Sequence, residues 1–258
     1  MAEPMAPDDL EFTLIDEESF AAIPSPARPG SRCQTCDYWE RLDGYRDAPA
    51  ADATGADTRA ALKRQRLLAG RQLAGAYGML AWRGGGDGRV AVGWAQFGPI
   101  SAYPRAQSIR ERYPALPDSP PPWVVTCLQV MADAPDRDTA AIGLLEAVCA
   151  ELDRRGITAV EAFPEGRGDD WVTAPGPIRV YAAAGFEQAA GDERYPVMRR
   201  ELGGSGESLE WGDLLARAQP PADQGEGWPL PLPNGPSEED LFRLPPPKPR
   251  RPNPFGED

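Results

Sequence analysis

The 258-residue chain contains no histidine, and this limits the residue types that could carry out catalysis. A chain without histidine has no Ser-His-Asp or Cys-His nucleophile system and no His-ligated metal site. Proton transfer must therefore depend on Asp, Glu, Tyr or Cys side chains.

Two of the four cysteines form a closely spaced pair, Cys33-Gln34-Thr35-Cys36. The same spacing occurs in half of a four-ligand zinc site and in redox-active pairs. There is no second such pair, and Cys127 and Cys149 lie in apolar runs, where buried thiols are common. A structural role, a redox-sensitive pair and a pair of metal ligands all stay open for Cys33 and Cys36. Since a zinc site needs four ligands, we expect no metal site.

The charge balance bears on the class of partner. Asp and Glu outnumber Lys and Arg by 40 to 27, which gives a net charge of −13 and a pI of about 4.6. Proteins that bind nucleic acid neutralise phosphates with clustered basic residues. We therefore expect no nucleic-acid partner. An acidic surface tolerates a cationic substrate such as an amine, although it also serves solubility.

The N-terminal segment, Met1 to Asp9, has neither the basic nor the apolar region of a signal peptide. No apolar run reaches the length of a membrane span. These observations predict a cytoplasmic protein with reduced thiols and no membrane partner.

The elements that must position the candidate residues follow from apolar periodicity. Two apolar runs flank the glycine-rich stretch 84–88, which predicts a β-hairpin. Residues 123–130 predict a strand buried on both faces. Helical spacing of apolar residues then predicts a helix that ends at Gly156. The expected elements are strands at 76–82, 89–97, 123–130, 158–163 and 196–202, helices at 59–74, 139–155 and 177–184, and an irregular loop at 101–122.

The order strand, helix, strand, helix predicts a βαβα unit with parallel strands. The fold class is therefore α/β (α+β), with a central twisted sheet flanked by helices. The 30 prolines exceed the usual share and predict a non-globular part. We expect a flexible segment at 1–30 with a first strand at 11–15, a folded domain at 31–202, a short amphipathic helix at 203–218 and a disordered proline-rich tail at 219–258.

Three local motifs make the chain resemble the GNAT superfamily of N-acetyltransferases. The helix, glycine and strand of residues 144–161 are similar to the central helix and following strand of that family. Tyr181-Ala182-Ala183-Ala184-Gly185-Phe186 matches its Tyr-x-x-x-Gly-Phe signature, and Val92 to Phe97 resembles its third strand. The resemblance implies a GNAT-type mixed fold and an acyl-CoA-binding domain over 31–202.

The same resemblance implies acetyl-CoA as cosubstrate. Free amides at the start of a helix would bind the pyrophosphate, and a strand that diverges from its neighbour would bind the pantetheine arm. The family's loop reads Gln/Arg-x-x-Gly-x-Gly/Ala, but here Thr139 replaces the first glycine and Asp136 adds negative charge. The residues expected to bind the cofactor are Leu128, Gln129, Val130, Arg137, Asp138, Thr139, Ala140, Ala141, Ile142 and Gly143.

The resemblance also implies transfer of the acetyl group to a primary amine, on a small molecule or a protein. Direct attack in a ternary complex needs no covalent intermediate, so the absence of histidine is no obstacle. Tyr181 stands where the family's tyrosine protonates the CoA thiolate. Glu161, near the end of a strand, is the first candidate base, and Glu40 is the second.

A second interpretation is a catalytically weak or inactive GNAT-fold protein with an interaction or regulatory role. Its C-terminal tail would recruit a protein partner, because proline-rich segments dock on aromatic grooves. The altered loop near Thr139 favours this interpretation, and Tyr181 in its expected place favours the enzyme.

Overall fold

The structure is a computed structural model that describes residues 10–24, 32–42, 53–70, 75–117, 120–132, 134, 136–165, 171 and 176–203. All of these residues belong to the first of the chain's two units, Met1–Leu214. Apart from Gly203, the helix expected at 203–218 and the tail expected at 219–258 lie outside the described residues, as do residues 1–9.

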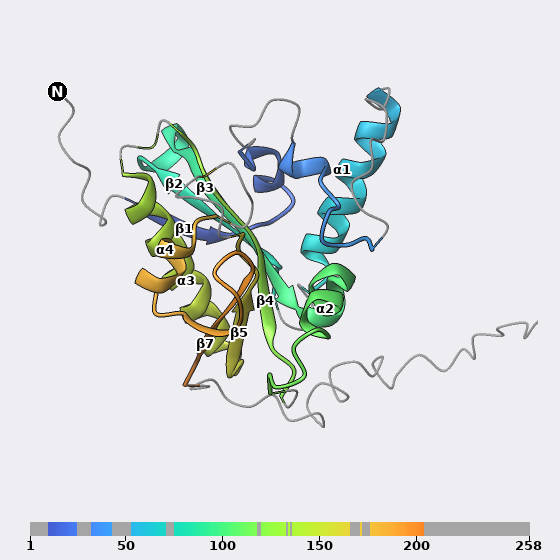
Figure 1. Cartoon of the computed structure of the whole chain (residues 1–258). Helices are drawn as coiled ribbons and strands as arrows, with labels where there is room; N and C mark the ends of the chain where they lie inside the picture. Colours follow the sequence, from blue (N-terminus) through green and yellow to red (C-terminus); the bar gives the residue numbers. More distant parts are fainter. Residues whose placement is uncertain are drawn as a thin grey trace, which may run out of the picture. The chain divides into compact units, whose positions relative to one another are not determined.

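A seven-stranded sheet lies at the centre (Figure 1), with the strand order β1-β2-β3-β4-β5-β7-β6. β4 and β5 are parallel, and every other neighbouring pair is antiparallel. A parallel pair needs a crossover connection, which the helix α3 provides. The strands are β1 (Leu10–Leu14), β2 (Gly78–Arg83), β3 (Val90–Pro99), β4 (Trp123–Val130), β5 (Ala159–Ala162), β6 (Glu187–Gly191) and β7 (Pro196–Glu201).

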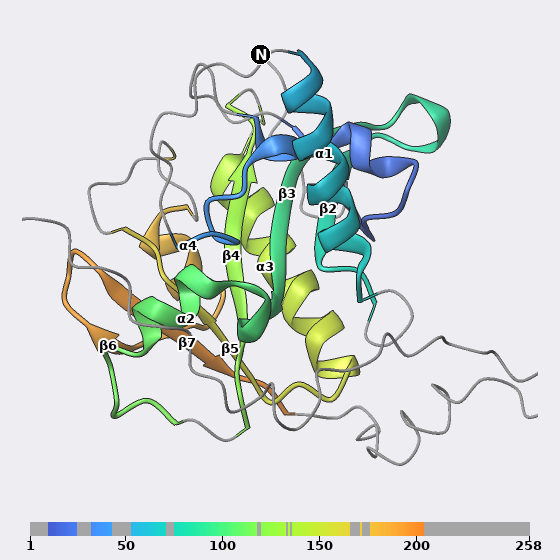
Figure 2. The same ribbon diagram turned by 90° about the vertical axis from the view of Figure 1, so that its right-hand side faces the viewer.

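Helices cover both faces of the sheet. α3 and α4 lie on one face, and α1 and α2 lie on the other (Figures 1 and 2). The α-helices are α1 (Ala53–Leu68), α2 (Pro104–Arg110), α3 (Arg137–Arg154) and α4 (Ile178–Ala183), and the short 3-10 helices are η2 (Ser19–Ala22), η3 (Cys33–Thr35), η4 (Gly86–Gly88) and η5 (Ile100–Ala102). Within the described residues, no helix combines the length and the apolar character needed to cross a bilayer.

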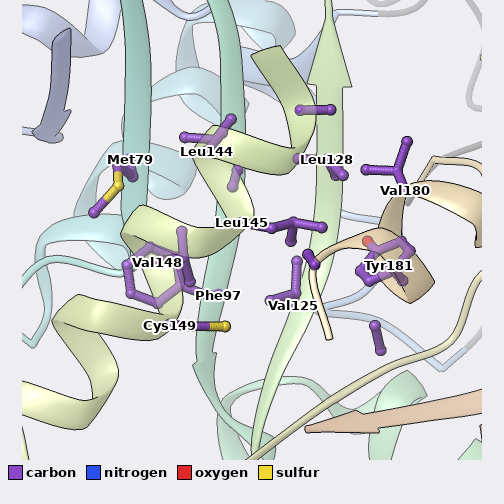
Figure 3. Packing of buried hydrophobic residues seen from close by; sticks show 14 of the residues in the cluster. Met79, Phe97, Val125, Leu128, Leu144, Leu145, Val148, Cys149, Val180 and Tyr181 are labelled. Atoms are coloured by element: carbon purple, nitrogen blue, oxygen red, sulfur yellow. The ribbon is translucent and has the colours of Figure 1, made fainter. Parts of the chain in front are cut away.

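Two apolar clusters, one on each face, hold the helices to the sheet. On the first face Leu144, Leu145 and Val148 of α3 pack against β4 (Figure 3), and burial of each such side chain contributes about 1.5–3 kcal/mol. On the second face Trp94 and Tyr103 belong to a separate cluster. All eight residues of β4 are buried, as expected for a central strand between two helical layers.

The N-terminal part of the domain corrects one expectation. The first strand begins one residue earlier than predicted, at Leu10, and pairs with β2. Ile15, Phe20 and Ile23 are buried in the cluster on the second face. The expectation of a flexible segment is therefore wrong for residues 10–24, because their apolar side chains complete that core.

The starts of two helices also differ from expectation. α1 begins at Ala53, six residues before the predicted start, and its last turn ends at Leu68. α3 begins at Arg137 because Asp136 caps the helix, so the Asp136-Arg137-Asp138 stretch is the cap and first turn of the helix. β6 was not predicted, since its residues are mostly exposed and show no apolar alternation.

Candidate functional site

The first element of the candidate site is the divergence of β4 from β5. The two strands pair only from Trp123 to Val125 on one side and from Val160 to Ala162 on the other. β4 continues through residues 126–130, where it pairs with β3 and, within the described part of the chain, with no strand on its other side. Backbone groups of a strand without a neighbour need other partners.

The open side of β4 is approached by Gly176. An added Cβ at Gly176 would lie 3.5 Å from the Leu128 carbonyl oxygen, and the residue has a φ of +94°, which favours glycine. At the end of β4, Arg137 Nε donates a 2.8 Å hydrogen bond to the Val130 carbonyl oxygen. The first residue of α3 and the segment just before α4 therefore border the stretch of β4 that carries Leu128, Gln129 and Val130.

The second element is the start of α3, where a pyrophosphate was expected. The Asp136 carboxylate accepts hydrogen bonds from the Thr139 amide at 3.0 Å and from the Thr139 hydroxyl at 2.7 Å. These bonds, the hydroxyl first, lower the pKa of Asp136. A helix N-terminus attracts anions. Here the chain's own carboxylate occupies the position that a phosphate would take.

The other residues whose backbone amides were expected to bind the cofactor lie further along α3. The Ala140 amide is bonded to the Asp136 carbonyl oxygen in the first helical turn, and Ala140 and Ala141 are buried in the core. An added Cβ at Gly143 would lie 3.1 Å from the Phe12 ring of β1, so this glycine permits close packing of α3 on the sheet. Ile142 packs against the same core. The residues of α3 that can still be proposed to bind a phosphate are those of its first turn, Arg137, Asp138 and Thr139.

Two arginines lie at that first turn, Arg137 within it and Arg179 on α4. Arg179 of α4 donates to the Asp138 carboxylate from Nε at 2.6 Å and from Nη2 at 3.0 Å, which is the main cause of the lowered pKa of Asp138. Trp171 Nε1 donates to the same carboxylate at 3.1 Å. The Arg137 guanidinium lies 4.7 Å from the Trp171 ring centre, and its Nη2 is buried with no partner among the described residues.

Tyr181 lies in the core on the α3 side, beside Val180 and close to Val125 and Leu128 of β4 (Figure 3). Its side chain is fully buried and makes an edge-to-face contact with Phe186 at 5.3 Å. Burial raises the pKa of the Tyr181 hydroxyl well above its usual value. A tyrosine hydroxyl is protonated at neutral pH in any case, and the raised pKa makes it a weaker proton donor, so its burial suits a structural aromatic residue at least as well as a general acid.

Glu161 is fully buried between two arginines. Its Oε2 accepts from Arg110 Nε at 3.0 Å, and its Oε1 accepts from Arg199 Nη1 at 2.7 Å. The contacts join α2 to β5 and β7. Both carboxylate oxygens are therefore engaged in charge-assisted hydrogen bonds that connect separate elements. The arrangement favours a structural role for Glu161 over the expected role as base.

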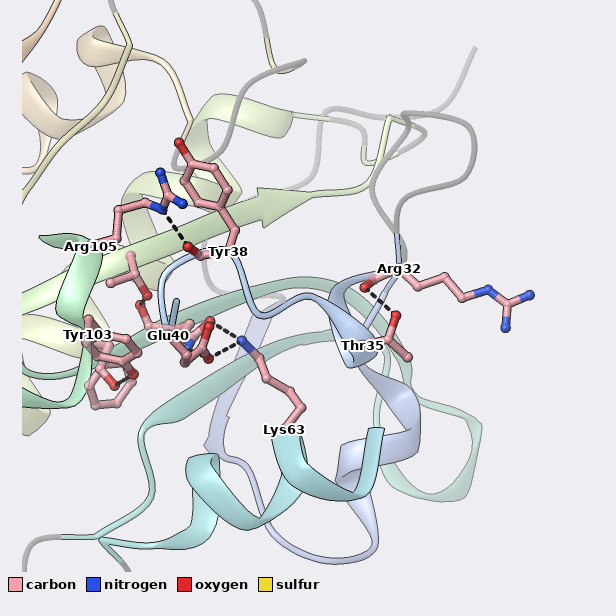
Figure 4. Close-up of polar contacts among 10 residues, drawn as sticks. Arg32, Thr35, Tyr38, Glu40, Lys63, Tyr103 and Arg105 are labelled. Atoms are coloured by element: carbon pink, nitrogen blue, oxygen red, sulfur yellow. Dashed lines mark hydrogen bonds and ion pairs between the residues drawn. The ribbon is translucent and has the colours of Figure 1, made fainter. Parts of the chain in front are cut away.

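Glu40 belongs to a second buried polar group, on the face that carries α1 and α2 (Figure 4). Lys63 Nζ of α1 donates to Glu40 Oε1 at 2.6 Å and to Gln96 Oε1 at 2.7 Å. Gln96 Nε2 donates to the same Glu40 oxygen at 2.8 Å. The Lys63 and Glu40 side chains are 3 % and 4 % exposed. We call Glu40, Lys63 and Gln96 the buried triad.

The cysteines near the buried triad are protonated thiols. Burial raises the pKa of Cys33 to about 11 and the pKa of Cys127 well above its usual value. All four cysteines are free. Thiolates act as nucleophiles and metal ligands, whereas buried thiols are inert. In the described ranges no three His, Cys, Asp or Glu residues come together as a group that could hold a metal ion. A structural role suits Cys33 best.

Sequence reasoning missed most partners of these sites. Lys63 carried no signal of its own, because it lies among basic residues of a polar helix and meets Glu40 only through the fold. Gln96 was part of a quoted motif but had no assigned role. The missed partners are Lys63, Gln96, Arg110, Trp171, Arg179 and Arg199.

Comparison with known proteins gives likenesses of structure alone, since neither a protein-family model nor a curated protein sequence matches the chain. The structure of yncA from Salmonella typhimurium with its cofactor acetyl-CoA is similar over 75 % of this chain and 94 % of that one, at 18 % identity and a TM-score of 0.43.

Two further solved structures are of the same kind. An N-acetyltransferase from Staphylococcus aureus Mu50 matches over 75 % of this chain and 97 % of that one, at 14 % identity and a TM-score of 0.41. A GNAT-family protein from Desulfovibrio desulfuricans matches over 58 % and 82 % of the two chains, at 20 % identity and a TM-score of 0.34. Such values establish no shared substrate or catalytic residue. The sheet with its single parallel pair, α3 as the crossover helix and the Tyr181–Phe186 motif after it give the chain a GNAT-type fold.

Proposed function

We propose that the chain is an acyl-CoA-dependent N-acyltransferase, which moves an acetyl group from acetyl-CoA to a primary amine by direct attack in a ternary complex. The divergence of β4 from β5 supports this proposal most strongly. Backbone groups of residues 126–130 that point away from β3 offer hydrogen bonds to the amides of a pantetheine arm. The Leu128 or Val130 amide would bind the thioester oxygen as charge develops on it.

The start of α3 fits a phosphate in part. Arg137 and Arg179 supply two guanidinium groups, which bind phosphate oxygens well. Asp136 and Asp138 oppose this, because each adds a negative charge where the phosphate would lie. Phosphate binding would therefore exchange the Asp138–Arg179 ion pair for an Arg179–phosphate pair and displace the Asp136 side chain from Thr139.

In the proposed reaction the amine nitrogen forms a bond to the thioester carbon, and the carbon–sulfur bond breaks. The nitrogen loses one proton and the departing sulfur gains one, so the products are an N-acetyl amide and CoA. Tyr181 would supply the proton to sulfur, since its side chain packs close to Leu128 of β4, and it would be reprotonated after CoA leaves.

A second candidate function is an interaction protein that binds acyl-CoA weakly or not at all. The observation that favours it is the Asp136 carboxylate on the Thr139 amide, which fills the anion site from within the chain. In that case the divergence of β4 and β5 would be an inherited feature of the fold without a ligand.

Thermal unfolding of the full chain with and without acetyl-CoA separates the two candidates. A ligand that binds only the native state raises its melting temperature with concentration. We expect a rise with acetyl-CoA and a smaller one with adenosine, which lacks both the phosphates and the pantetheine arm. No rise at millimolar acetyl-CoA would favour the interaction protein.

Turnover is best followed by chromatographic measurement of CoA released in the presence of a panel of primary amines. Thiol reagents are unsuitable, because the chain has four free cysteines of its own. Release of CoA that depends on the amine supports the enzyme. A rise in melting temperature without turnover on any amine would support binding of the cofactor without catalysis.

A further inference from the structure

One oxygen of the Glu40 carboxylate is buried without a hydrogen-bond donor. Oε1 receives Lys63 and Gln96, whereas Oε2 has no partner among the described residues, and the side chain is only 4 % exposed. Burial of a carboxylate oxygen without a donor is costly, so such atoms usually have a partner in the functional state. The buried triad is therefore complete only when a further donor reaches Oε2.

The buried triad lies next to the stretch of β4 that diverges from β5. Gln96 of β3 is the register partner of Cys127 in β4, and the unpaired stretch of β4 begins at Thr126. Cys127 belongs to the apolar cluster on the face of α1 and α2, opposite α3. A molecule held at Glu40 therefore meets the same stretch of β4 from the face opposite the proposed cofactor helix.

We infer that Oε2 of Glu40 binds the amino group of the acyl acceptor and accepts its proton during transfer. The inference rests on the proposed function. As the nitrogen attacks the thioester carbon and the carbon–sulfur bond breaks, the nitrogen's proton passes to Oε2 and then to solvent, while the sulfur takes its own proton. An amine that has begun to bond to carbon is strongly acidic, so its proton passes readily to an acceptor oxygen within hydrogen-bond distance.

The surroundings of Glu40 select the kind of amine. Trp39 and Tyr103 are buried on the same face of the sheet as the buried triad. Burial raises the pKa of Tyr103, and the nearby charge of Glu40 raises it further. The Lys63 ammonium, 2.6 Å from Oε1, would repel a second cation on the acceptor. The acceptor is therefore a monoamine with an apolar group, such as benzylamine, in preference to a diamine such as putrescine.

The first test measures amine binding directly, without turnover. The full chain is titrated calorimetrically with benzylamine, with benzyl alcohol as the probe that lacks the amino group. We expect saturable binding of benzylamine, no comparable binding of benzyl alcohol, and at least tenfold weaker binding of benzylamine to Glu40→Gln. Glu151→Gln, a carboxylate paired with arginines on α3, is the matched control and should bind as the unmodified chain does. Equal binding by Glu40→Gln, or no binding by the unmodified chain, overturns the inference.

A second variant keeps the inference testable if Glu40→Gln fails to fold with Lys63 left unpaired. Glu40→Asp keeps the negative charge beside Lys63 but shortens the side chain by one methylene group, which withdraws the carboxylate from the amino group. We expect at least tenfold weaker binding of benzylamine to Glu40→Asp, with the rise in melting temperature caused by acetyl-CoA unchanged. Binding of benzylamine by Glu40→Asp as tight as by the unmodified chain would also overturn the inference.

Different results would contradict the role of Glu40 and the proposed function. A chain whose melting temperature rises with acetyl-CoA, but whose Glu40→Gln variant binds and acetylates benzylamine normally, contradicts the role of Glu40 alone. A chain that shows neither the rise nor release of CoA contradicts the proposed function itself.

Discussion

The Asp136 carboxylate lies 3.0 Å from the Thr139 amide nitrogen, so the N-terminus of α3 already holds an anion that belongs to the chain. In an acyl-CoA-binding fold this end of the helix would receive a phosphate. The same side chain therefore stabilises the helix as a cap and competes with the proposed cofactor.

Asp136→Asn should separate these two effects. Asparagine caps helices about as well as aspartate, so the melting temperature of the free protein should change little. Removal of the negative charge should tighten acetyl-CoA binding severalfold in a calorimetric titration. Asp192→Asn is the matched control, because Asp192 caps the turn between β6 and β7 through the amides of Arg194 and Tyr195. Weaker or unchanged binding by Asp136→Asn would mean that the phosphates do not lie at this helix.

Tyr181→Phe should lower kcat by about 10²- to 10⁴-fold while the rise in melting temperature with acetyl-CoA stays the same, because only the proton donor is removed. The aromatic ring and its contact with Phe186 are retained, so the core should stay packed. Steady-state kinetics with the best amine of the panel measures the effect. If kcat stays within twofold, Tyr181 has a structural role only.

The sequence predicted the elements that depend on local pattern. β4 and α3 were recognised because continuous burial and helical periodicity are visible along a short stretch of chain. The resemblance located Tyr181 by its motif. The pairing of Lys63 with Glu40 could not be predicted. It joins residues that are 23 positions apart, and their burial depends on how α1 packs against the segment that follows η3.

The role of Glu161 could not be predicted from the sequence for a similar reason. Its position near the end of a strand indicated an available carboxylate, but Arg110 and Arg199 come from elements distant in the chain. Only tertiary structure decides whether a strand-end carboxylate is solvated, catalytic or paired. The same holds for Asp138, whose partner Arg179 lies on another helix.

Glu161→Gln should destabilise the protein by about 3–5 kcal/mol, because two arginines that are mostly buried would lose their shared carboxylate. Urea denaturation measures this loss. The variant that stays folded should retain the amine-dependent turnover, since in our interpretation Glu161 holds α2 to the sheet and does not accept the proton. Its control is Glu201→Gln, which removes the exposed carboxylate that also pairs with Arg199. Loss of turnover with unchanged stability would restore Glu161 as the base.

Alkylation of the cysteines should depend steeply on pH. Burial raises the pKa of Cys33 from 9.0 to about 11, so at pH 8 only about one molecule in a thousand carries the Cys33 thiolate, compared with about one in ten for an ordinary thiol. Iodoacetamide labelling followed by mass spectrometry should therefore modify Cys33 about 100-fold more slowly than a free thiol, and the rate should rise up to pH 11. Cys127, whose pKa burial raises well above its usual value, should react slowest of all until the protein is unfolded. Rapid labelling of Cys33 at neutral pH would indicate a thiolate, and with it the redox role that the Cys33–Cys36 spacing left open.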